Sequence, residues 1–154
     1  MTKNLDIYTD GASRGNPGLA AIGVVIKENG KIVKELSQTI GTATNNVAEY
    51  TALIYALQEA LMLKAQTIKV FTDSELMYQQ LKGIYKVKTE HIKQLFEQVE
   101  HLFKGFASFK ITHIPREKNR DADALANKAI KKEQAKVVAS SSSCEGEESP
   151  SSKG

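Results

Sequence analysis

The sequence predicts a single α/β domain built on a five-stranded mixed sheet with helices on both faces. Three strand-like segments open the chain, helical and strand-like segments follow in turn, and two strands end in an aspartate. The opening pattern is typical of antiparallel strands, and the later alternation is typical of crossovers that return to the same sheet. A length of 154 residues with 41% hydrophobic residues is enough for one domain with a core.

The first three strands are expected within the first 40 residues. Apolar and polar residues alternate from Leu5 to Asp10, residues 21–27 form an apolar run, and a third extended stretch covers residues 32–40. Asn29-Gly30 favours a two-residue hairpin between the last two strands, because both positions tolerate a positive φ. The Gly-rich residues 11–18 are expected to form the loop before the second strand.

The rest of the chain predicts four helices and two further strands. Residues 45–63 carry apolar side chains at three-to-four spacing, and either Thr44 or Asn45 can cap this helix. The later elements are expected as a strand at 67–72, a short helix at 74–82, a helix between Thr89 and Gly105, a strand at 109–114 and a helix from about Asn119. A right-handed crossover places the fourth strand beside the first, which gives the sheet order 3-2-1-4-5.

The C-terminal segment differs in composition from the rest of the chain. Residues 136–154 are rich in Ser and Glu and lack the apolar periodicity that offsets the entropy of ordering. We therefore expect residues 1–135 to form the domain and residues 136–154 to be disordered. Because residues 133–154 carry a formal charge of −2, residues 1–132 carry +5, which permits a polyanionic partner without requiring one.

Composition also limits the compartment and the chemistry. The single cysteine, Cys144, excludes a disulfide framework and a Cys-based zinc site. No apolar run approaches the ~18 residues that span a bilayer, and the N-terminus lacks the apolar core of a signal peptide. We expect a monomeric, cytoplasmic protein with no membrane partner.

Two strands end in an aspartate that is followed by a small residue, at Asp10-Gly11 and Asp73-Ser74. On adjacent parallel strands, which lie about 4.8 Å apart, both carboxylates reach the edge where open α/β sheets bind ligands. A buried carboxylate is costly without a cationic partner, so the pair indicates a metal site. Either dipeptide alone is more typical of an ordinary turn than of a metal site.

Glu49 and Asp123 are the other two candidate metal ligands. Each lies near the start of a predicted helix, where an acidic side chain can also serve only to complement the helix dipole. Four carboxylates without a Cys or His cluster favour Mg²⁺, or Mn²⁺, over zinc. Two such ions about 4 Å apart activate a water and stabilise the leaving oxygen of a phosphodiester.

Three further segments are candidates for phosphate chemistry. Gly11, Gly15, Asn16 and Gly18 offer backbone N–H groups, although a plain connecting loop explains them as well. Thr44-Asn45-Asn46 precede a helix, whose dipole favours an anion. His113 and Arg116 flank Pro115 shortly before Asp123, where either could assist the reaction.

Four blocks of the sequence resemble, in order, the signature blocks of the type 1 ribonuclease H family. The blocks are Tyr8-Thr9-Asp10-Gly11-Ala12, Thr44-Asn45-Asn46 with Glu49, Thr72-Asp73-Ser74, and Asn119 with Ala122-Asp123-Ala124-Leu125-Ala126. The resemblance covers about residues 3–132. It implies a ribonuclease H-like fold and two-metal hydrolysis of the RNA strand of an RNA–DNA hybrid. Whether double-stranded RNA is also cut stays open.

Carried over by position, the resemblance assigns metal binding and catalysis to Asp10, Glu49, Asp73 and Asp123. It implies substrate contacts at Gly11, Ser13, Asn16, Thr44, Asn45, Asn46, Ser74 and Asn119. Two rival functions remain, a non-catalytic hybrid-binding module and another nuclease of the same fold. Four intact carboxylates argue against a pure binder of phosphates, and the complete set of blocks argues against another nuclease.

The sequence departs from the family pattern at two places. Many bacterial members carry a long Lys- and Trp-rich handle, but here residues 82–88 are all that remains and the chain has no Trp. It is similar to compact members without the basic handle. In the loop before Asp123, many members use a His, whereas the Pro115-Arg116-Glu117 form resembles members that use Arg, so we favour Arg116 over His113.

Overall fold

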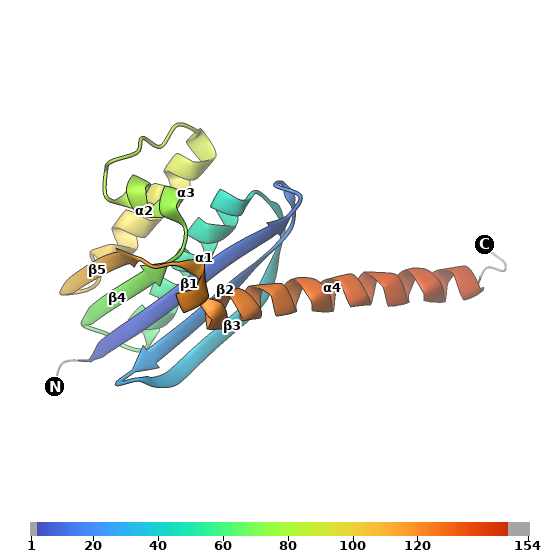
Figure 1. Ribbon diagram of the computed structural model, residues 1–154, viewed down its shortest axis with the longest axis horizontal. Helices are drawn as coiled ribbons and strands as arrows, with labels where there is room; N and C mark the ends of the chain where they lie inside the picture. The colour runs from blue at the N-terminus through green and yellow to red at the C-terminus, as the bar shows by residue number, and fades with distance from the viewer. Residues whose placement is uncertain (1–2, 148–154) are drawn as a thin grey trace.

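The computed structural model of the protein describes residues 3–147. Its five strands form one mixed sheet in the order β3-β2-β1-β4-β5 (Figure 1). The strands are β1 (Asn4–Arg14), β2 (Gly18–Glu28), β3 (Lys31–Ala43), β4 (Thr67–Thr72) and β5 (Ser108–His113). The first three pair antiparallel, whereas β4 runs parallel to β1 and β5 runs parallel to β4. The predicted strand order is confirmed.

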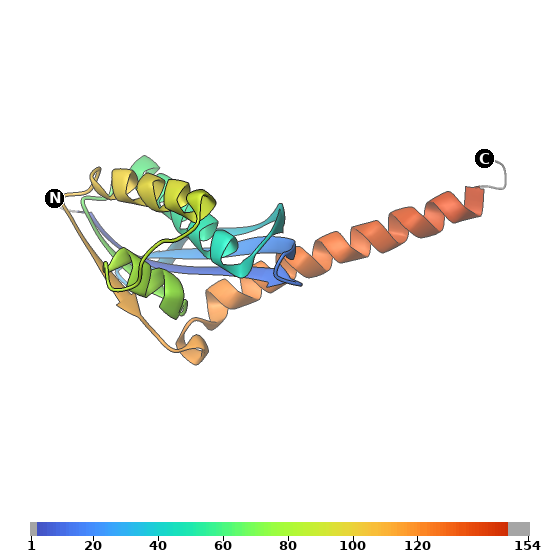
Figure 2. The same cartoon turned by 90° about the horizontal axis from the view of Figure 1, so that it is seen from above.

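Helices cover both faces of this sheet, as expected. The helical elements are α1 (Asn45–Met62), α2 (Glu75–Leu81), α3 (Glu90–Phe103), the 3-10 turn η1 (Arg116–Lys118) and α4 (Arg120–Glu147). Seen along the sheet, α1 and α3 lie on one side and α4 crosses the other (Figure 2). Only residues 82–89 join α2 to α3, so the handle expected to be missing is absent from this connection.

The main core lies between the sheet and α1. Leu5 and Ile7 of β1 alternate with more exposed residues and pack with Leu53 and Leu57 of α1, all of them at most 1% exposed. A smaller cluster with Ile130 of α4 packs on the opposite face of the sheet. Burial of both faces explains why β2 is apolar along much of its length.

Two glycines let the helices approach the sheet closely. A Cβ on Gly11 would lie 2.3 Å from the backbone carbon of Ala48 in α1, and one on Gly23 would lie 2.0 Å from the carbonyl oxygen of Ala122 in α4. Both distances are far below ordinary van der Waals contact, so neither position admits a side chain without movement of a helix. The two helices that carry Glu49 and Asp123 are thus fixed against β1 and β2.

The expected loop at residues 11–18 is wrong in its extent. β1 continues to Arg14 and β2 begins at Gly18, which leaves a three-residue connection with positive φ at Gly15 and Asn16. The ladder runs on because residues 11–14 still pair with β2. The Asn29-Gly30 hairpin is confirmed, with positive φ at both positions.

The C-terminal segment also differs from the expectation of disorder. α4 runs without a break to Glu147, so residues 136–147 are helical, and residues 148–154 lie outside the described part. Residues 133–136 (Glu-Gln-Ala-Lys) are good helix formers, and a helix already begun extends at little cost. Within residues 3–147, no helix is both long and apolar enough to cross a bilayer.

Candidate active site

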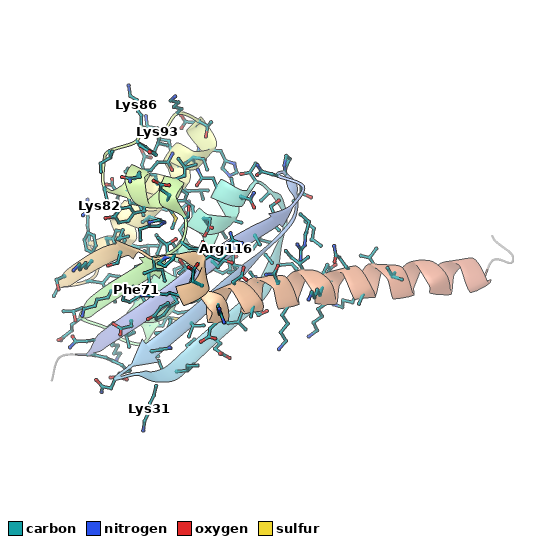
Figure 3. The ribbon with its side chains drawn as sticks, in the orientation of Figure 1. Lys31, Phe71, Lys82, Lys86, Lys93 and Arg116 are labelled. Carbon is teal, nitrogen blue, oxygen red and sulfur yellow. The ribbon has the colours of Figure 1, made fainter. Side chains whose placement is uncertain are left out.

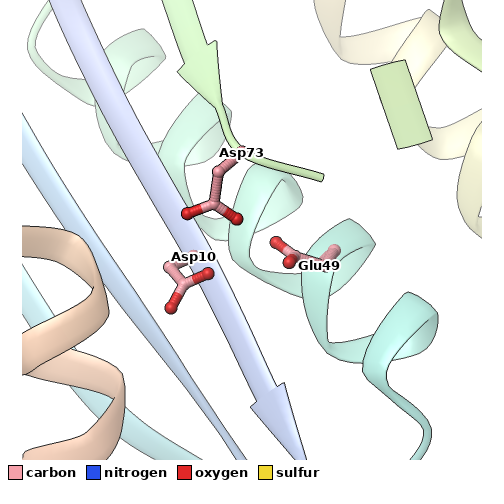
Figure 4. Close-up of side chains that lie close together, drawn as sticks. All are labelled: Asp10, Glu49 and Asp73. Carbon is pink, nitrogen blue, oxygen red and sulfur yellow. The ribbon is translucent and has the colours of Figure 1, made fainter. Parts of the chain in front are cut away.

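Three carboxylates converge beside the central strand β1, at the point where the neighbouring strand β4 ends. Each of Asp10, Glu49 and Asp73 places an oxygen within 4.8 Å of an oxygen of the others (Figure 4). The pairing of Thr9 with Thr72 puts the residues that follow them, Asp10 and Asp73, side by side, and Glu49 comes from α1 just after its first turn. The predicted convergence is therefore present in the structure, although Asp10 lies within β1, which continues to Arg14, and only Asp73 follows the end of a strand.

Glu49 is held by the strand that carries Asp10. Its Oε1 accepts a hydrogen bond of 3.0 Å from the backbone N–H of Gly11, and the side chain is buried. Burial raises the pKa of Glu49 well above its ordinary value, and the charges of Asp10 and Asp73 raise it further. The Gly11 N–H and the Arg116 guanidinium oppose these effects.

Asp10 lies at the centre of the acidic cluster and is 2% exposed. Burial, the charge of Asp73 and the neighbouring Asp123 together raise the pKa of Asp10 to about 8, against a weaker opposing effect of Arg116. The cluster therefore lacks positive charge. A set of carboxylate oxygens with this deficit fits a hard divalent cation such as Mg²⁺.

Asp123 adjoins this cluster through Asp10. It lies in the first turn of α4, close enough to Asp10 to raise the pKa of that carboxyl. The Nδ2 of Asn127 donates to its Oδ1 at 3.2 Å and to its carbonyl oxygen at 3.0 Å. Asp123 is outside the close triangle of the other three, but it borders the same site.

Asn119 is hydrogen-bonded to the acidic cluster and to the strand beside it. It is 1% exposed, and its Nδ2 donates to the carbonyl oxygen of Thr9 at 2.8 Å and to Oδ2 of Asp73 at 3.1 Å. Its Oδ1 is buried and has no hydrogen-bond partner within the described residues. The sequence predicted a substrate contact here, and the structure adds a role in orienting Asp73.

The predicted substrate-binding residues at the start of α1 are tied to the β1–β2 connection. The Oδ1 of Asn45 accepts from the backbone N–H of Ser13 at 3.0 Å, and Asn16 Oδ1 accepts from the backbone N–H of Asn45 at 2.8 Å. Thr44, one of the two candidate caps, caps α1 by accepting from Val47 N–H. Two of the backbone donors proposed for phosphate, the N–H groups of Gly11 and Asn45, thus already have protein partners.

Asn46 belongs to a hydrogen-bond group that the sequence did not reveal. The Oε1 of Gln80 accepts from the hydroxyl of Tyr50 at 2.9 Å and from Nδ2 of Asn46 at 3.5 Å. The Oδ1 of Asn46 is buried without a partner within the described residues, beside a groove of about 620 Å³. The sequence signal for a buried Gln80 was its spacing from Met77, because residues i and i+3 lie on the same face of a helix and Met77 is buried.

Ser74 occupies a structural position next to the cluster. Its hydroxyl caps α2 by accepting from the backbone N–H of Met77 at 3.2 Å, and its own N–H donates to Thr72 Oγ1 at 3.0 Å. These bonds fix the turn that carries Asp73. The substrate contact predicted for Ser74 stays a prediction.

The two candidates in the loop before α4 have different surroundings. His113 ends β5 and is exposed, with its ring centroid 5.8 Å from that of Tyr78. Arg116 lies in η1, and its charge lowers the pKa of both Asp10 and Glu49. The effect of its charge on the acidic cluster therefore favours Arg116 over His113.

The sheet order, and the acidic cluster between the middle of β1 and the end of β4, define a protein of the ribonuclease H-like class. Residues 8–129 match the family model described as "Reverse transcriptase-like". The chain is 46% identical over 124 residues to ribonuclease HI of Halobacterium salinarum, an alignment that covers 80% of the chain and 62% of that relative. The chain thus spans less than two thirds of this curated relative's length.

Solved structures agree with the sequence comparison. The crystal structure of RNase H1 from Halobacterium salinarum superimposes with a TM-score of 0.82 at 44% identity, covering 84% of this chain and 98% of that one. The crystal structure of LC11-RNase H1 in complex with an RNA/DNA hybrid gives a TM-score of 0.80 at 45% identity, with 84% and 99% covered. The chain belongs to the type 1 ribonuclease H family.

Proposed function

We propose that the protein is an endoribonuclease that hydrolyses the RNA strand of RNA–DNA hybrids with Mg²⁺ as its metal. One observation carries the proposal, namely the approach of the Asp10, Glu49 and Asp73 carboxylates to within 4.8 Å with Asp123 at their edge. The solved relative whose complex contains an RNA/DNA hybrid supports the choice of substrate. We place the enzyme in the cytoplasm as a monomer.

In the proposed reaction, different residues bind the metal ions, orient the metal ligands and bind the phosphate. The four carboxylates would hold the divalent ions, whose chemistry is to activate a water and to stabilise charge on a phosphodiester. Asn119 fixes Asp73, and Gly11 fixes Glu49, so the ligands are oriented before the metal arrives. The Arg116 guanidinium, whose charge lowers the pKa of Asp10, would donate hydrogen bonds to a phosphate oxygen of the substrate.

A side-by-side cleavage assay tests this proposal. Purified protein is incubated with end-labelled hybrid, double-stranded RNA and double-stranded DNA, each with Mg²⁺, with Mn²⁺ and with EDTA. We expect metal-dependent fragments from the RNA strand of the hybrid and none from duplex DNA. Retention of the hybrid without cleavage would indicate a binding module, and cleavage of duplex DNA would indicate another nuclease. The same gel decides whether double-stranded RNA is a substrate.

A further inference from the structure

The guanidinium of Arg14, at the end of β1, is held by an amide. Its Nη2 donates to Oδ1 of Asn127 in α4 at 3.2 Å, and the Arg14 side chain is exposed. Within the described part of the chain, the ion pair found is that of Lys34 with Glu59, so no carboxylate there neutralises Arg14. Four of the five guanidinium N–H donors are left for a ligand.

Asn127 links this arginine to the candidate metal site. While its Oδ1 accepts from Arg14, its Nδ2 donates to Oδ1 and to the carbonyl oxygen of Asp123. Asn127 lies four residues after Asp123 and therefore on the same face of α4. The two ends of one amide thus fix a cation and a carboxylate relative to each other.

The position of Arg14 suits a phosphate of a nucleic-acid strand that enters the acidic cluster. The neighbouring residue Ser13 is hydrogen-bonded to Asn45 at the start of α1, and Asn45 is hydrogen-bonded to Asn16. Arg14 itself is hydrogen-bonded to α4, so it lies between the polar start of α1 and Asp123. A fixed, planar guanidinium matches the oxygens of a phosphate better than a flexible ammonium does.

We propose that Arg14 binds a backbone phosphate of the nucleic-acid substrate, and that Asn127 is a positioning residue that holds Arg14 and orients Asp123. The inference rests on the proposed function, since the phosphate belongs to the strand in the active site. It assigns two residues for which the signature blocks give no role. Arg14 increases the affinity for the nucleic acid. The side-chain amide of Asn127 holds Arg14 in place and also orients Asp123, a candidate metal ligand.

Binding measurements without divalent metal test the role of Arg14. Fluorescence anisotropy with a labelled hybrid from 50 to 200 mM salt compares the wild type with Arg14→Gln. The matched control, Lys31→Gln, removes one positive charge at the β2–β3 hairpin, far from Arg116 and the site (Figure 3). We expect Arg14→Gln to weaken binding about tenfold at low salt and to reduce the slope of log affinity against log salt by about 0.7–0.9. A slope equal to that of Lys31→Gln would overturn the assignment.

Asn127→Ala keeps the charge and tests the positioning role. We expect it to weaken hybrid binding severalfold alone, but to add little in combination with Arg14→Gln, because both changes remove one interaction. Calorimetric titration with Mn²⁺ in the absence of nucleic acid should show metal affinity reduced about tenfold by Asn127→Ala and unchanged by Arg14→Gln. Circular dichroism verifies that each variant is folded.

The outcomes separate this inference from the proposed function. Additive losses of hybrid affinity, or unchanged metal affinity in Asn127→Ala, would refute the positioning role. If the wild type cleaves hybrid while Arg14→Gln binds it like the control, only the inference about Arg14 fails. If the wild type cleaves no hybrid under any metal condition, the proposed function itself fails.

Discussion

Gly11 donates its backbone N–H to Oε1 of Glu49, and its α-carbon lies against the backbone of the same helix turn. The hydrogen bond measures 3.0 Å, and a Cβ at Gly11 would approach the backbone N of Glu49 to 2.4 Å. One residue of β1 therefore sets both the position of α1 and the orientation of a carboxylate on it. Since Asp10 precedes Gly11 directly, this contact fixes the spacing between two of the candidate metal ligands.

Gly11→Ala should damage both stability and activity. The added methyl group must push α1 away from β1, which we expect to lower the free energy of unfolding by about 1–3 kcal/mol and to displace Glu49. Urea unfolding and hybrid cleavage measure the two effects. As a control, Gly30→Ala meets no atom within 4 Å but has a φ of +80°. Gly30→Ala should lose stability but keep its activity. Equal losses of activity in Gly11→Ala and Gly30→Ala would contradict the role of Gly11.

Asp10→Asn should abolish cleavage and stabilise the metal-free protein. The pKa of Asp10 is raised to about 8 by burial and by neighbouring carboxylates, so the folded state retains a proton that the unfolded chain loses above its ordinary value of 3.8. Between pH 4 and 8 the wild type therefore loses stability as the pH rises, and the neutral amide removes this loss. In EDTA, we expect the variant to gain about 1–3 kcal/mol over the wild type at pH 8 and much less at pH 4.

Unfolding in urea at pH 4, 6 and 8, with EDTA or with Mg²⁺, measures this difference. Mg²⁺ should stabilise the wild type more than Asp10→Asn, because the variant lacks one ligand charge. A variant that is less stable than the wild type at pH 8 in EDTA would show that repulsion is not the main effect. Metal-dependent turnover by a preparation free of other nucleases would remove Asp10 from the catalytic set.

Arg116→Ala should reduce turnover more than His113→Ala. The charge of Arg116 acts on both Asp10 and Glu49, whereas the His113 ring packs near Tyr78. Loss of one charged hydrogen bond to a phosphate typically costs about 1.5–3 kcal/mol, which corresponds to at least a tenfold lower rate. Single-turnover cleavage with both variants decides the order, and a larger loss for His113→Ala would assign the loop function to the histidine.

Local pattern was enough to predict the sheet and the acidic cluster, but not the contacts that hold the cluster. The periodicity around Asp10 and Asp73 predicted two strands that each lead into an aspartate. The crossover rule then predicted that these two strands lie side by side. The bonds of Asn119 and Asn127 join segments that are distant in sequence or depend on helix phase, so no local signal specified their partners. Composition misled at residues 136–147, because a Ser-rich run can continue a helix that a packed segment has begun.

The last prediction concerns the number of phosphate contacts through which the protein binds its substrate. Residues 82–89 form only a short connection, so few basic groups can reach a second stretch of duplex. We expect a footprint of about three or four phosphate contacts around Arg14, the start of α1 and Arg116. On B-DNA each contact contributes about 0.9 to the slope of log affinity against log salt, which predicts a slope near −3 for the hybrid. Discrimination should come from the 2′-hydroxyl groups of the RNA strand.

Anisotropy titrations from 50 to 200 mM salt, with Asp10→Asn in EDTA, test this footprint. A slope typical of eight or more phosphate contacts would show that the protein reaches further along the duplex than the short connection at residues 82–89 suggests. A hybrid whose RNA strand carries 2′-deoxy substitutions near the cleavage site should bind less tightly, because the groups that distinguish RNA from DNA are missing. Equal affinity for the substituted hybrid and for the intact one would mean that the 2′-hydroxyl groups are not read in the bound state.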